Sequence, residues 1–96
     1  MKTKEEILND IKKMLFEDHP EIEITMDTFL EYGEGSFLDM SSIEIVDFIV
    51  KLETKYDIIV DIDDRYYTVG DAVLGVVGYL EEKARSEVGG NSESEV

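Results

Sequence analysis

The sequence contains no cysteine, so neither a disulfide nor a thiolate metal site can hold the fold together, and apolar packing must do so. It also lacks long apolar runs, because none exceeds three residues. We therefore expect no transmembrane span and no signal-peptide core, and a protein that stays in the cytoplasm without inserting into membranes. The length of 96 residues, with 43% hydrophobic residues, suits one domain with one core.

Positive charge is scarce: 9 Lys and Arg stand against 24 Asp and Glu, which gives a net charge of −15. Between Lys13 and Lys51 there is no Lys or Arg at all. Such a surface repels phosphates and anionic membranes, which disfavours nucleic-acid binding, and it attracts basic proteins. One interpretation is a docking surface for basic partners, and the other is an ordinary solvated acidic surface.

Three segments have the apolar spacing and the capping residues of helices. Thr3 and Glu6 have capping-box spacing before the first helix, which the approach to Pro20 ends. The second helix is predicted from about Asp39 to Lys55. Its capping residue is either Asp39 or Ser41, which has Glu44 three positions later.

This second predicted helix is apolar over most of its circumference, so we expect it to pack on more than one side. A third helix is predicted from Thr68, with Asp71 at capping distance. The last residues, 86–96, have no apolar periodicity and are predicted to be a disordered tail after a domain at 1–85.

Two connections carry alternating apolar residues. Within 21–38 the alternation suggests a strand, but no partner strand is adjacent, and a flexible glycine-containing stretch follows. The connection at 56–67 suggests a short strand or one helical turn. We predict an all-α helical bundle, with an α+β arrangement left open because two isolated strands are marginal.

Residues for catalysis are few, and we expect a protein that is not an enzyme. The single histidine, His19, stands where the first helix ends and is predicted to lie at the surface. A group of aspartates, Asp57, Asp61, Asp63 and Asp64, matches the spacing of a calcium loop at only two positions. Solvated carboxylates and helix caps are favoured over a metal site there, with weak cation binding left open.

Two motifs in order, Asp39–Val46 and Leu52–Ile58, resemble those of the acyl carrier and peptidyl carrier proteins. The segment Arg65–Val73 is similar to the one that opens the family's last helix, and the resemblance covers about residues 3–83. It implies a four-helix bundle with a long loop between the first two main helices. It also implies that 61–67 forms a short third helix.

The resemblance further implies a function. Carrier proteins hold 4′-phosphopantetheine on a serine at the start of the second helix and carry acyl or aminoacyl groups as thioesters in lipid, polyketide or nonribosomal-peptide metabolism. Enzymes with basic surfaces dock on that helix, where Glu44 and Asp47 match positions that contact partners. The resemblance implies that this protein is a monomer. Its implied partners are acyl- or aminoacyl-handling enzymes and a phosphopantetheinyl transferase.

The sequence departs from the family pattern at the attachment site. The family's serine stands five residues before the helix glutamate, and counting back from Glu44 reaches Asp39. An aspartate lacks the hydroxyl that the modification needs. Two interpretations follow: a carrier-like interaction subunit without the arm, or an active carrier with a shifted serine, for which Ser41 and, less well placed, Ser36 are candidates. An acidic binding module unrelated to acyl chemistry is a further alternative.

Overall fold

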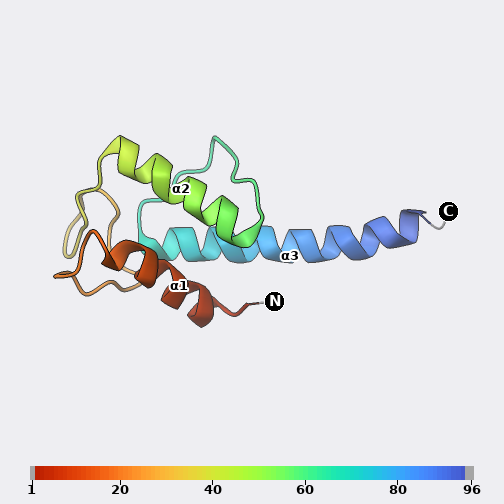
Figure 1. The fold of residues 1–96 in the computed structure, drawn as a ribbon, viewed down its shortest axis with the longest axis horizontal. Coiled ribbons are helices and arrows are strands. Elements are labelled where there is room, and N and C mark those ends of the chain that lie inside the picture. The colour runs from red at the N-terminus through yellow and green to blue at the C-terminus, as the bar shows by residue number, and fades with distance from the viewer. Residues whose placement is uncertain (1, 95–96) are drawn as a thin grey trace.

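The computed structural model describes residues 2–94, with 87–94 described by their helical backbone alone. It contains three helices: α1 (Lys4–Phe16), α2 (Ser42–Tyr56) and α3 (Val69–Ser94). Within the described residues no strand forms, and the only β-pairing consists of two isolated bridges. The all-α prediction is confirmed, and Figure 1 shows α3 as the long element against which the others are arranged.

Each helix begins at a reciprocal pair of side-chain to backbone hydrogen bonds, as the sequence spacing predicted. The pairs are Thr3 with Glu6, Ser41 with Glu44, and Thr68 with Asp71. These bonds satisfy backbone N–H groups that the first turn of a helix leaves without partners.

The start of α2 differs from the prediction. The helix begins at Ser42 with Ser41 as its N-cap, and Asp39 is neither helical nor the cap. Asp39 has a φ of 52°, in the left-handed region, so the chain turns at this residue before it enters the helix.

The core is built from all three helices, from the loop between α1 and α2, and from Ile58 in the connection that follows α2. That loop adds buried side chains to those of the helices: Ile24, Thr28, Leu30, Leu38 and Met40. The helical part comprises Ile7, Ile11, Leu15, Phe48, Leu52, Tyr56, Val69, Ala72, Val73 and Val76. The loop is therefore a structural part of the domain.

Backbone hydrogen bonds hold this long loop against the start of α3. The N–H of Leu30 donates to the carbonyl of Tyr67 at 2.8 Å, and the N–H of Gly70 donates to the carbonyl of Met26 at 2.8 Å. A Cβ atom at Gly70 would lie 2.8 Å from that Met26 oxygen, so the close approach needs glycine. The long loop is confirmed, and the strand suggested by its alternating residues does not form.

The connection between α2 and α3 contains a turn where a short helix was predicted at 61–67. The N–H of Asp64 donates to the Asp61 carbonyl at 3.0 Å, and the N–H of Asp63 donates to the Asp61 carboxylate at 2.8 Å. The aspartate side chain thus offers the backbone a partner that competes with a helix. A four-helix bundle is not confirmed.

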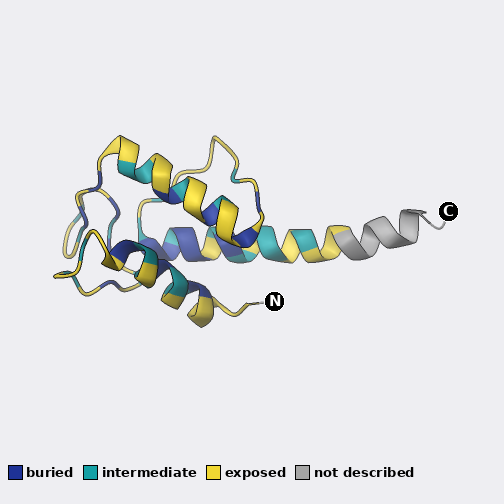
Figure 2. Cartoon of the chain, in the orientation of Figure 1, coloured by how far each residue is buried: buried dark blue, intermediate teal, exposed yellow. Residues whose placement is uncertain are grey.

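One face of α2 is solvent-exposed, although its apolar residues predicted packing on more than one side. Ile43, Val46 and Val50 are 81%, 63% and 50% exposed. Figure 2 shows exposed residues along much of α2, with buried positions toward α3. The prediction is wrong for these residues because no helix of the described chain packs against this side of α2.

The C-terminal part of α3 continues through most of the segment 86–96, for which the sequence predicted no regular structure. Glu95 and Val96 lie outside the described residues, and the domain boundary at 85 stays a prediction. None of the described helices has the combined length and apolar character that crossing a bilayer requires.

Candidate functional site

The predicted attachment residue Asp39 lies just ahead of α2 and is exposed. Its N–H donates to the carbonyl of Glu31 at 2.9 Å, which ties the turn to the loop between α1 and α2. Its carboxylate has no hydrogen-bond or ion-pair partner among the described side chains. Asp39 is therefore accessible, but it is separated from the first helical residue by Met40 and Ser41.

The alternative attachment residue, Ser41, is committed to the helix cap. Its Oγ accepts a hydrogen bond of 3.2 Å from the N–H of Glu44, and its own N–H donates to Glu44 Oε1 at 3.0 Å. These backbone and side-chain bonds hold the pKa of the Glu44 carboxyl below its usual range. A substituent on the Ser41 oxygen would disturb this cap.

Ser42, the first residue of α2, was not among the sequence predictions. It is exposed, and its hydroxyl has no hydrogen-bond partner among the described residues. A signal for it is present in the sequence, because Asp47 follows Ser42 by five residues. That is the interval between serine and helix carboxylate in the carrier pattern, and the prediction counted it from Glu44 instead.

A groove of about 680 Å³ begins at Ser42 and runs between α2 and the connection that leads to α3. This volume lies within the range of about 300–1,000 Å³ that is usual for small-molecule sites. The α2 wall is apolar between Ser42 and Glu53 and consists of Ile45, Val46, Ile49 and Val50. The opposite wall comes from residues 60–62 and 64–67, and Glu31 also contributes.

Hydrogen bonds anchor the wall of the groove that lies opposite α2. The N–H of Val60 donates to Glu53 Oε2 at 2.9 Å, which fastens the connection to α2. The Tyr79 hydroxyl of α3 donates to Asp64 Oδ2 at 2.6 Å and accepts a bond of 2.8 Å from the N–H of Asp61. The groove is thus held open by contacts between segments distant in sequence.

Tyr66 lines the groove, and its ring reaches toward α3. Its hydroxyl is buried and has no hydrogen-bond partner among the described residues. The space for that hydroxyl exists because residue 75 is glycine, since a Cβ atom there would collide with it. Burial, with the Asp64 carboxylate nearby, raises the pKa of Tyr66 to about 12, so the phenol stays neutral.

The two predicted partner-binding carboxylates lie on the same helix, and each is close to a basic side chain. Glu44 Oε2 is 3.7 Å from His19 Nε2, and Asp47 Oδ2 is 3.1 Å from Lys51 Nζ. Both carboxylates retain exposed surface, so they remain accessible to a partner. They flank the exposed apolar residues of α2 described above.

His19 packs in the gap between the end of α1 and the start of α2, and its side chain is only 15% exposed. A hollow of about 30 Å³ beside it is about the size of one water molecule. This environment makes His19 a linking residue between the two helices, more buried than the predicted surface histidine.

The aspartates that partly matched a calcium loop do not converge. Asp57 is 94% exposed and pairs with Lys83 Nζ at 2.9 Å, while Asp64 binds Tyr79. Within residues whose side chains are described, no three carboxylate or histidine groups come close enough to hold one metal ion.

Comparisons with known proteins add no assignment, because no family model, no curated protein and no solved structure matches the chain. The functional interpretation rests on the residues and geometry of α2 and the groove.

Proposed function

We propose that this protein is a carrier of the acyl-carrier type in which Ser42 bears a 4′-phosphopantetheine arm. The observation that carries the proposal is an exposed serine with a free hydroxyl, at the first position of a capped helix, opening onto a groove. This is the active-carrier alternative with the attachment residue moved to Ser42.

The motif register supports Ser42. Ser42 and Ile43 take the places of the family's serine and leucine, and Val46–Ile49 takes the place of its Val-Glu-Leu-Val segment. Ser41 then stands in the aspartate column, where it caps the helix. Asp39 lies outside the motif in this register.

The chemistry of the position also fits the group. The positive end of the α2 macrodipole lies next to Ser42, and it favours the negative charge of a phosphodiester. In the modification, the Ser42 oxygen bonds to the β-phosphorus of coenzyme A, loses its proton, and displaces adenosine 3′,5′-bisphosphate. The transferase supplies the catalysis, and this chain supplies the hydroxyl and its position.

Docking is proposed to use the exposed face of α2. Ile43, Val46 and Val50 form an apolar stripe, and Glu44 and Asp47 add negative charge beside it. An apolar centre with charged flanks suits a partner that has a basic rim around an apolar patch. The transferase and the acyl- or aminoacyl-handling enzymes are the proposed partners.

Intact mass after incubation with coenzyme A and a broad-specificity phosphopantetheinyl transferase tests the attachment. We expect one phosphopantetheine mass on the native chain, the same mass on Asp39→Asn and Ser41→Ala, and none on Ser42→Ala. A modified Ser42→Ala protein would move the site elsewhere, and no modification with several transferases would overturn the active carrier.

A second candidate function is a binding module without an arm, which the exposed stripe on α2 favours. Its test is pull-down of a carrier-dependent enzyme by unmodified Asp47→Lys, with Glu82→Lys on α3 as the matched charge control. Binding that is lost only in Asp47→Lys, without any modification of Ser42, would favour this second function.

A further inference from the structure

The two walls of the groove differ in chemistry. The α2 wall carries the side chains of Ile45, Val46, Ile49 and Val50 and ends at the carboxylate of Glu53, while the remaining lining includes three carboxylates and one cation. With Glu53 the four carboxylates of the groove are those of Glu31, Glu53, Asp61 and Asp64, and the cation is Arg65. A single groove therefore offers both apolar contact and an excess of negative charge.

This negative charge is not neutralised within the described chain. None of the four carboxylates takes part in an ion pair between described residues. The Arg65 guanidinium folds onto its own segment, where it donates to the carbonyls of Ile62 and Asp64 at 3.0 and 3.2 Å. An occupant with positive charge would thus meet carboxylates that no cation of the described residues neutralises.

The position of the charge along the groove also matters. The α2 wall from Ser42 to Glu53 is about 16 Å long at the usual helical rise. The bond from Val60 to Glu53 places the neighbouring Asp61 at the end away from Ser42. A chain anchored on Ser42 and lying along α2 would bring its free end toward Glu53 and Asp61.

From this arrangement, and resting on the function proposed above, we propose that the groove receives an aminoacyl group with an apolar side chain. The protonated amine would face the carboxylates, and the side chain would contact the apolar α2 wall. A plain hydrocarbon chain fits less well, because it would remove water from charged carboxylates without supplying a counter-charge. The groove thereby distinguishes aminoacyl from fatty acyl cargo.

Two compounds that differ only in the amine test this selectivity: N-(2-acetamidoethyl)leucinamide and N-(2-acetamidoethyl)-4-methylpentanamide. Each is titrated into the full unmodified chain at about pH 6, where the α-amino group is protonated. The methyl NMR signals of Val46, Ile49 and Val60 report occupancy of the groove. We expect the leucine compound to bind at least about ten-fold more tightly than its neutral analogue.

The variant Asp61→Asn/Asp64→Asn should abolish this ten-fold preference, because amides keep the hydrogen-bond acceptors and remove the charge. The matched control Asp27→Asn/Glu82→Gln removes equal charge from exposed positions outside the groove and should keep the preference. Equal or tighter binding of the neutral compound, no binding of either, or a preference that survives in the groove variant would each overturn the inference. The titration needs no arm, so its outcome is independent of the mass test at Ser42.

Discussion

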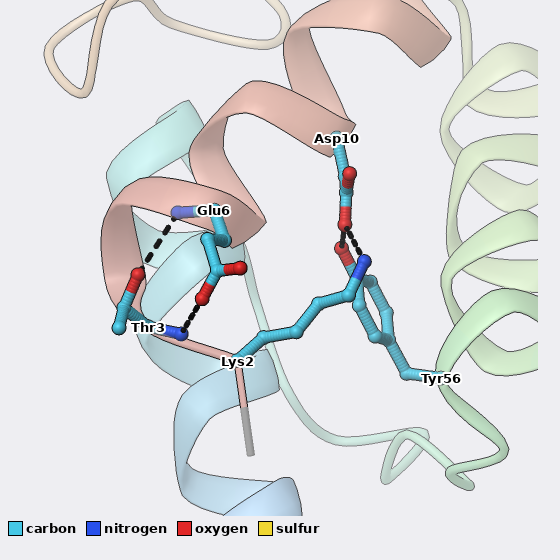
Figure 3. Close-up of polar contacts among 5 residues, drawn as sticks. All are labelled: Lys2, Thr3, Glu6, Asp10 and Tyr56. Carbon is cyan, nitrogen blue, oxygen red and sulfur yellow. Dashed lines mark hydrogen bonds and ion pairs between the residues drawn. The ribbon is translucent and has the colours of Figure 1, made fainter.

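The Tyr56 hydroxyl at the end of α2 donates a 2.7 Å hydrogen bond to the Asp10 carboxylate on α1 (Figure 3). The same carboxylate oxygen accepts a 2.7 Å ion pair from Lys2, whose ammonium lies 5.8 Å from the centre of the Tyr56 ring. These three side chains connect the N-terminal segment, α1 and the last turn of α2. They hold α1 and α2 together at the end remote from Ser42.

Removing the Tyr56 hydroxyl should weaken this connection. We expect Tyr56→Phe to lower the free energy of unfolding by about 1–2 kcal/mol, because the lost hydrogen bond involves a charged acceptor. Urea denaturation followed by circular dichroism measures the change. The control is Tyr32→Phe, at a 77% exposed ring, which should change stability by less than about 0.5 kcal/mol. Equal effects of the two substitutions would contradict the expectation.

The same contact should make stability depend on acidity. Burial raises the pKa of Asp10, but the bonds from Lys2 and Tyr56 outweigh burial and leave that pKa below the usual 3.8. A depressed folded-state pKa means that the contribution is present above the unfolded pKa and is lost as pH falls through the folded value. We therefore expect the stability difference between native chain and Asp10→Asn to shrink below about pH 4. A difference that stays constant from neutral to acidic pH would rule this out.

Tyr66 and Gly75 should show coupled effects on stability. Tyr66→Phe removes a buried hydroxyl without a partner, so we expect a gain of about 1 kcal/mol. Gly75→Ala introduces a methyl group where that hydroxyl lies, and overpacking should cost about 1–3 kcal/mol. The double variant should recover most of this loss, as measured by thermal and urea unfolding. Additive effects would show that the two groups do not compete for space.

The two adjacent serines should respond differently to removal of their hydroxyls. Ser41→Ala deletes the N-cap acceptor of α2 and should lower the free energy of unfolding by about 1 kcal/mol. Ser42→Ala deletes a hydroxyl without a structural partner and should leave stability within about 0.5 kcal/mol of the native value. Chemical denaturation of both proteins makes the comparison, and a larger loss in Ser42→Ala would refute the assigned division of roles.

Salt should stabilise the folded chain at neutral pH. A net charge of −15 makes carboxylates repel one another in the compact state, and salt screens this repulsion. We expect the melting temperature to rise between about 10 mM and 500 mM NaCl, where the Debye length falls from about 30 Å to a few ångströms. Equimolar comparison of NaCl with KCl controls for specific ion binding. A falling melting temperature would mean that attractive ion pairs dominate the surface.

Local features of this protein follow from the sequence alone. The three helix starts could be predicted because a capping box depends on residues three positions apart, whose geometry the backbone of one turn determines. The all-α class and the long first loop follow from apolar spacing in the same way. The spacing behind the proposed attachment residue is also local: five residues before Glu44 stands Asp39, and five residues before Asp47 stands Ser42.

The remaining features depend on tertiary contacts. The apolar side chains of Ile43 and Val46 predicted that both residues are buried. They are exposed because no helix of the described chain packs over them. The turn at Asp61 is held in position by Tyr79, eighteen residues later, whose hydroxyl accepts a hydrogen bond from the Asp61 N–H. The groove beside Ser42 likewise exists because distant segments meet there. Sequence by itself determined the helices, their caps and the charge, since these depend on neighbours along the chain, and only the tertiary structure decided which serine is free and what faces it.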